Sequence, residues 1–333
     1  MEEEAISKSA AAATACTAMA LLYVAILHAP TLILRLPPPP SFDSFMIRRF
    51  IGAAVSSVLS LLICTLILPI RSKEASILFD VYGIRVDHIW QAVVLPVSLT
   101  CLMYAGSLVL KALLLVDWWR ERVSRAWRNY VVAPLTEELV FRACMIPLLL
   151  CGGFKPYTAI CLCPIFFSLA HLNHLMEFYS KQNFSLIKTF MVVGLQLGYT
   201  VIFGSYASFL YVRTGHLLAP LVAHIFCNFM GLPKLFSRRS GMVSVAFVAG
   251  MVGFLWLLFP MTHPDLYAND EVRIVCTLRG LPDGSSRRVE RRIVGTLKGL
   301  NGDFIPTDLW LVGPIGKGIY PDGSKTRYFT LTG

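Results

Sequence analysis

Long apolar runs separated by short polar segments make up the chain as far as Pro260. Most of these runs approach the roughly 20 residues that an α-helix needs to cross the hydrocarbon core of a bilayer. The pattern therefore predicts an all-α polytopic membrane protein with about eight transmembrane helices packed as a bundle. The runs are Thr14–Leu34, Phe50–Ile70, Ile89–Val116, Tyr130–Cys151, Tyr157–Met176, Ile187–Tyr211, His216–Leu232 and Met242–Pro260.

From His263 onward the chain is polar and its pattern changes. Turn sequences occur at Pro282–Gly284 and again at Pro321–Gly323, with β-prone stretches beside them. This alternation predicts a short β-rich segment of roughly two or three hairpins. We therefore expect a membrane-embedded domain in residues 1–262 and a polar tail in residues 263–333, with no catalytic pattern in the tail.

Composition and charge support a membrane protein. Of the 333 residues, 56% are apolar and 15% are charged, whereas soluble domains carry about 25% charged residues. The net charge of +10 comes largely from basic residues in alternate loops, which places those loops in the cytoplasm and both termini on the opposite side. Bases dispersed in this way are topology signals, and we expect no nucleic-acid partner. These residues are Arg35, Arg48, Arg49, Arg120, Arg122, Arg125, Arg128, Lys181, Lys234, Arg238 and Arg239.

Several small residues of the apolar runs are interpreted as packing residues. Nine cysteines are present, and no two have the Cys-x-x-Cys spacing of a zinc or redox motif. All but one lie within or beside an apolar run, where a thiol packs as a small apolar group. Gly194-x-x-x-Gly198 is likewise interpreted as a helix-packing face.

Two adjacent carboxylates, Glu137 and Glu138, interrupt the fourth apolar run, and Arg142 follows them. A charge at bilayer depth costs roughly 2.5–3.5 kcal/mol on insertion scales, so such residues are rare and usually mark function. On an α-helix Glu138 and Arg142 share a face and can pair, whereas Glu137 points about 100° away. This difference predicts a supporting role for Glu138 and Arg142 and a general base at Glu137. The alternative is a buried ion pair that only orders the bundle.

Two other runs contain histidine. His171 and His174 are three residues apart on one helical face, and neutral imidazole suits proton transfer or metal binding. His224 and Asn228 are four residues apart, and their N–H groups could stabilise an oxyanion in a low-dielectric site. The alternative for each is a hydrogen bond that joins two helices.

These three polar groups, in this order and each inside an apolar run, resemble the motifs of the type II CAAX prenyl endopeptidases, the Ras and a-factor converting enzymes of the endoplasmic reticulum membrane. The resemblance covers roughly residues 45–262. It rests on the doubled glutamate with the arginine, on Phe167-x-x-x-His171 and on His224-x-x-x-Asn228. The tail is a departure, because members of this family usually end soon after the last span.

The resemblance implies a catalytic cavity within the membrane. Glu137 and His171 would activate a water that attacks the scissile amide carbonyl. His224 and Asn228 would hold the resulting oxyanion.

The remaining motif residues would have secondary roles. Glu138 and Arg142 would orient the first pair, and His174 would contact substrate or solvent. The enzyme would remove the C-terminal tripeptide of a farnesylated or geranylgeranylated CaaX protein without a cofactor or a metal. Its partners would be these proteins and membrane lipid, and it would be a multi-pass protein of the endoplasmic reticulum membrane.

Two other classes of protein could use the same residues. A zinc protease would take Glu137, His171 and His224 as ligands and Glu138 as base, although the sequence lacks the HExxH motif. A proton-coupled transporter would use intramembrane carboxylates and histidines as a relay. It predicts flux that depends on Glu137, and no proteolysis.

Overall fold

The computed structural model describes residues 2–37, 39–68, 75–113, 131–181, 186–231 and 241–267. This part of the chain is helical and contains no strand, which confirms the predicted all-α fold class. Each predicted apolar run is helical over most of its described length. The elements are α1 (Glu2–Leu32), α2 (Phe42–Ile67), α3 (Ala75–Val81), α4 (Ile89–Met103), α5 (Ala105–Leu113), α7 (Ala133–Glu138), η2 (Leu139–Cys144), α8 (Met145–Cys151), α9 (Pro156–Lys181), α10 (Leu186–Thr214), α11 (Leu218–Met230), α12 (Gly241–Met261) and η3 (Pro264–Leu266).

Several of these helices can cross a membrane. Within the described residues, three are long and apolar enough by themselves: Ser7–Pro30 of α1, Ser44–Ile67 of α2 and Gly241–Met261 of α12. The pair α4 and α5 meets the same criterion if the two are one bent span. The protein is therefore a multi-pass membrane protein, and the count of about eight spans stays a prediction.

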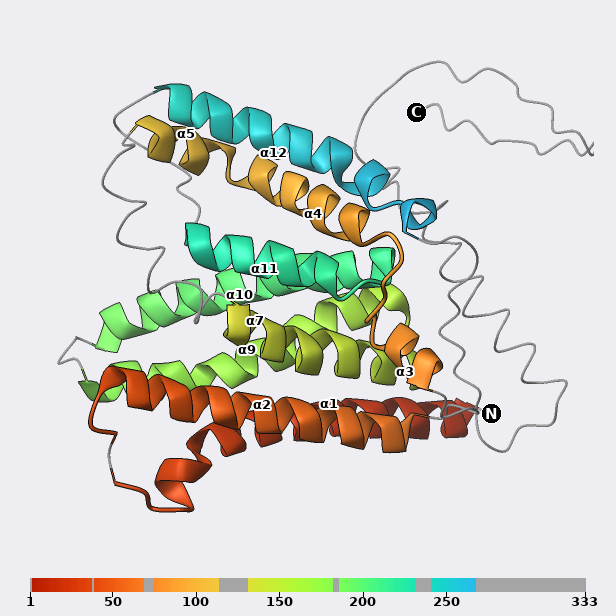
Figure 1. Ribbon diagram of the computed structural model, residues 1–333, viewed down its shortest axis with the longest axis vertical. Helices are drawn as coiled ribbons and strands as arrows, with labels where there is room; N and C mark the ends of the chain where they lie inside the picture. The colour runs from red at the N-terminus through yellow and green to blue at the C-terminus, as the bar shows by residue number, and fades with distance from the viewer. Residues whose placement is uncertain are drawn as a thin grey trace, which may run out of the picture.

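The helices lie roughly along one direction in the bundle (Figure 1). Helices α1 and α2 pack together on one side, and α4, α5 and α12 form the opposite side. Between them lie α7 to α11, with α9 packed along α10. One hydrophobic cluster joins α1, α2, η2, α8 and α9, and a second joins α4, α10, α11 and α12.

The run Ile89–Val116 is not one straight helix, because the chain bends by 77° between α4 and α5. The break lies at Tyr104, directly before Ala105-Gly106-Ser107, and glycine beside serine is a known cause of sharp kinks. Helix α12 packs tightly against the bend. A Cβ atom on Gly250 would lie 2.3 Å from the carbonyl oxygen of Leu102, so only glycine fits there.

Two other expectations concern the edges of the bundle. A Cβ atom on Gly194 or Gly198 would meet no atom of the described residues within 4 Å, so these residues form no packing face within this part of the chain. The described chain ends at Tyr267, just after η3. The predicted hairpins lie outside the described residues, and the division into residues 1–262 and 263–333 stays a prediction.

Candidate active site

The doubled glutamate lies at the end of α7, and the next turn is a π-helix rather than the predicted α-helix. Such single π-turns occur frequently at functional sites. The predicted ion pair nevertheless forms across this turn, with 3.0 Å between Arg142 Nη1 and Glu138 Oε1. Both side chains are completely buried. A charged pair removed from water in this way is costly unless further groups satisfy it.

Two neighbouring helices supply such groups to Arg142. Its Nη2 donates to the carbonyl oxygen of Gly204 on α10, at 3.4 Å. Its guanidinium lies over the ring of Phe167 on α9, 4.8 Å from the centroid, in a geometry that attracts a cation to the ring face. Helix α10 can approach because residue 204 is glycine: a Cβ atom there would lie 2.9 Å from Cβ of Pro164.

His224 on α11 lies between the two glutamates. Its Nδ1 is 2.7 Å from Glu138 Oε1, and its Nε2 is 3.6 Å from Glu137 Oε2. Because an ionised carboxylate only accepts, the proton of the first contact resides on Nδ1. The sequence motifs did not predict this contact, because Glu138 was expected to support Glu137 and His171.

Aromatic rings fix the position of the imidazole. The ring of Phe203 on α10 is tilted against it at 5.1 Å, and that of Phe167 meets it edge-on at 6.2 Å. Phe167 belongs to the first hydrophobic cluster and Phe203 to the second. The site therefore lies where the two clusters of the bundle meet.

The charged residues of the site differ in their access to water. The side chain of Glu137 is 19% exposed, whereas that of Glu138 is fully buried. Asn228 lies one helical turn beyond His224 and its side chain is exposed. Glu137 is thus the glutamate that a water molecule can reach.

Comparison with known proteins places the chain in a family. A family model described as type II CAAX prenyl endopeptidase Rce1-like matches residues 119–230. CAAX prenyl protease 2 of Arabidopsis thaliana is 55% identical over 301 residues, which cover 83% of this chain and 96% of that protein. The human protein of the same name is 35% identical over 277 residues, which cover 76% of this chain and 82% of the relative. The chain belongs to the CAAX prenyl protease 2 family.

Membership of the CAAX prenyl protease 2 family confirms the resemblance inferred from the motifs and the expectation of a CAAX prenyl endopeptidase. No solved structure matches the chain.

The histidines of the second motif lie on α9, but the side chains of His171 and His174 are outside the described part of the structure. Helix α9 carries position 171 one turn beyond Phe167 and on the same face. Among the described residues, no three His, Cys, Asp or Glu side chains gather as a metal-binding group. The structure thus brings together Glu137, Glu138, Arg142 and His224, while the roles of His171 and His174 stay predictions.

Proposed function

We propose that this protein removes the C-terminal tripeptide of farnesylated or geranylgeranylated CaaX proteins in the endoplasmic reticulum membrane. The observation that supports the proposal most is the position of His224 between Glu137 and Glu138. Two carboxylates and an imidazole in contact within a membrane bundle are costly and call for a chemical role. Family membership supplies the substrate class, since the relatives are named CAAX prenyl proteases.

Glu137 is the general base of the proposed reaction. It takes a proton from a water molecule, with His171 as the second group that orients this water. The water oxygen attacks the scissile carbonyl carbon and forms a tetrahedral oxyanion. Glu137 then returns the proton to the nitrogen of the leaving tripeptide as the carbon–nitrogen bond breaks.

His224 and Asn228 are the proposed donors to the oxyanion. Because Nδ1–H of His224 is held by Glu138, the group that faces the reacting atoms is Nε2, on the side of Glu137. It donates to the oxyanion when the ring carries both protons.

Cleavage of a farnesylated CaaX peptide by the purified protein tests the proposal. We expect that Glu137→Ala and His171→Ala each abolish cleavage while the protein still inserts into the membrane. Asn228→Ala lowers kcat by about 10²-fold, the typical cost of one oxyanion donor. Substantial activity in either of the first two variants contradicts the mechanism.

A chelator separates this mechanism from the zinc alternative. Metal-stripped protein retains activity if Glu137 and His171 act directly on water. Loss of activity that zinc restores would instead assign Glu137, His171 and His224 to a metal.

A further inference from the structure

Where the π-turn ends and α-helix resumes, the hydrogen-bond pattern leaves one backbone carbonyl bypassed, without a backbone N–H donor. A π-helix joins N–H(i) to the carbonyl at i−5 and an α-helix joins it to that at i−4, so one carbonyl between the two patterns receives no backbone N–H. Here the N–H of Met145 bonds to the carbonyls of Val140 and Arg142. The bypassed carbonyl is that of Phe141, between these two.

A thiol from a neighbouring helix donates a hydrogen bond to this carbonyl. Cys163 on α9 donates from Sγ to the oxygen of Phe141 at 2.6 Å, and both residues are completely buried. A backbone carbonyl left without a donor in an apolar environment costs several kcal/mol. The cysteine interpreted from the sequence as a packing residue therefore satisfies a polar group as well.

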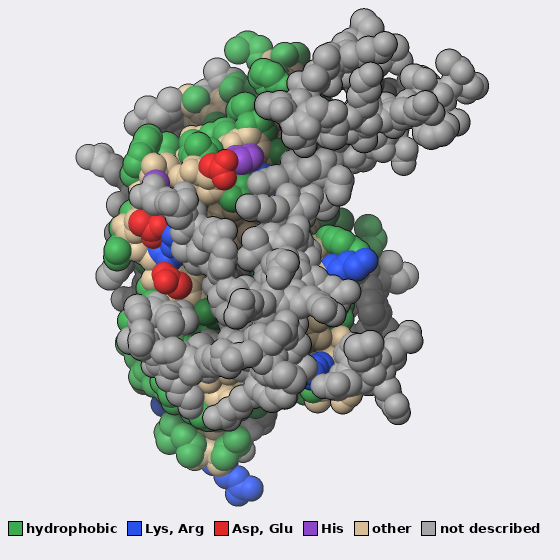
Figure 2. Space-filling model, turned by 90° about the vertical axis from the view of Figure 1, so that its right-hand side faces the viewer, with side chains coloured by type: hydrophobic (Ala, Val, Ile, Leu, Met, Phe, Trp, Pro, Cys, Tyr) green, Lys and Arg blue, Asp and Glu red, His purple; other side chains and the backbone are tan. Residues whose placement is uncertain are grey.

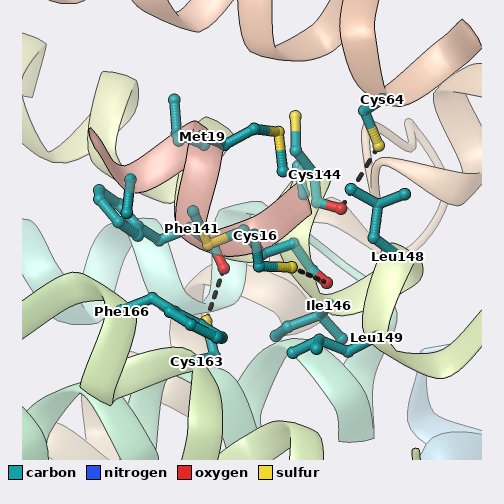
Figure 3. Packing of buried hydrophobic residues seen from close by; sticks show 14 of the residues in the cluster. Cys16, Met19, Cys64, Phe141, Cys144, Ile146, Leu148, Leu149, Cys163 and Phe166 are labelled. Atoms are coloured by element: carbon teal, nitrogen blue, oxygen red, sulfur yellow. Dashed lines mark hydrogen bonds between the residues drawn. The ribbon is translucent and has the colours of Figure 1, made fainter. Parts of the chain in front are cut away.

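Other small donors hold the same segment (Figure 3). The thiol of Cys64 on α2 points to the carbonyl of Cys144 at 3.4 Å, and that of Cys16 on α1 to Met145 at 3.8 Å. A thiol is a weak hydrogen-bond donor in each of these contacts. Of the three, only the contact of Cys163 lies at the bypassed carbonyl.

We propose that Cys163 is a positioning residue, whose thiol stabilises the π-turn that sets Arg142 against Glu138. Phe141 directly precedes Arg142, so relaxation of the turn towards an α-helix moves the guanidinium relative to the carboxylate. Glu138 holds His224, and the displacement reaches the imidazole through that contact. The effect on catalysis rests on the proposed function, whereas the thiol contact itself does not.

Three variants test this role in the peptide assay. Cys163→Ala removes the donor, and we expect kcat to fall about tenfold with KM changed less than twofold. Cys163→Ser keeps a donor at the same position, and we expect it to retain most of the activity. Cys161→Ala is the matched control, since this exposed cysteine lies two residues earlier on the same helix. Equal kcat in C163A and wild type overturns the proposal, as does equal loss in C163S and C163A.

The infrared S–H stretching band gives a readout that does not depend on activity. A donating thiol absorbs at lower frequency than a free one. The difference spectrum between wild type and C163S should show loss of a low-frequency band, and loss of a band at the free-thiol frequency overturns the contact. This measurement also decides the matter if C163A does not fold. Absence of cleavage by the wild-type protein contradicts the proposed function and leaves the spectroscopic test intact.

Discussion

The adjacent glutamates have different surroundings, and the roles that we propose for them differ accordingly. Glu138 is fully buried, and its Oε1 accepts from both Arg142 and His224. Glu137 faces His224 from a partly exposed position. One carboxylate therefore holds the site together, and the other is available for chemistry.

Substitution by glutamine separates these roles. Glu137→Gln should lower kcat by about 10²–10⁴-fold, the usual contribution of a general base, and leave the melting temperature close to wild type. Glu138→Gln removes the charge that balances a buried arginine, and losing one partner of such a pair costs about 3–5 kcal/mol. Thermal unfolding in detergent, measured beside the cleavage assay, distinguishes them. The same loss of stability in both variants would contradict the assignment.

Local spacing was enough to predict part of the site. The four-residue interval identified the Glu138–Arg142 pair, since residues at that spacing meet on one helical turn. The contact of His224 with Glu138 joins residues 86 positions apart. No periodicity encodes such a contact, because it depends on how α11 packs against α7.

At the scale of helices, the close approach of α10 to α9 positions the groups around Arg142. Gly204 lets α10 approach Pro164 of α9 and brings a carbonyl oxygen to Arg142. The apolar runs predicted most helices close to their observed bounds, although α1 and α2 begin well before the predicted residues. They predicted neither the π-turn nor the bend at Tyr104, because both arise from contacts between helices and from single small residues. The Gly106-Ser107 pair was a sequence signal for the bend.

Adding one methyl group tests the crossing. The Cβ atom of Gly204→Ala would lie 2.9 Å from Cβ of Pro164 and 3.3 Å from Arg142 Nη2. We expect a destabilisation of about 1–3 kcal/mol, as for overpacked cores, together with reduced kcat. Gly198→Ala on the same helix is the control, because its Cβ meets no described atom. It should be neutral or stabilising, since alanine favours helix. Equal effects of the two changes would refute the role of the crossing.

The loops at one end of the bundle contain a second buried polar group. Arg85 pairs with Asp87, and Nε2 of His216 lies 3.9 Å from Asp87 Oδ1. His216 is completely buried in the loop between α10 and α11. Figure 2 looks onto this end, where acidic, basic and histidine side chains lie among apolar ones, although His216 itself is completely buried.

This group makes stability depend on pH. The pKa of His216 is lowered from 6.5 to about 4, chiefly by burial and then by the positive charge of Arg85. His88 lowers this pKa further, and the negative charge of Asp87 raises it in part. Between these values the unfolded chain binds a proton that the folded chain does not, so acidification favours unfolding. We expect a loss of up to about 3 kcal/mol from pH 7 to pH 4. His216→Gln should flatten this part of the curve of melting temperature against pH, and an unchanged slope would contradict the assignment.

At the scale of the whole molecule, the basic loops lie at one end of the bundle and the termini of the membrane domain at the other. The basic loops follow α1, α5, α9 and α11, and these helices end on the left in Figure 1. The beginning of α1 and the end of α12 lie on the right. The positive-inside rule then places the left end in the cytoplasm. This orientation stays a prediction, and with it Glu137 on α7 would follow a cytoplasmic loop, on the side of the proposed prenylated substrates.

Glycosylation tests this orientation. Asn183-Phe-Ser185 is a natural acceptor sequence in a loop that we place in the cytoplasm, and it should carry no glycan. Asp283→Asn creates the acceptor Asn-Gly-Ser in the tail, which follows the last span and is predicted to lie on the opposite side. We expect an endoglycosidase-sensitive increase in mass for this variant and none for wild type. Asp322→Asn creates a second acceptor of the same kind and serves as a check on position. A glycan on Asn183 would invert the orientation and place the candidate active site towards the lumen.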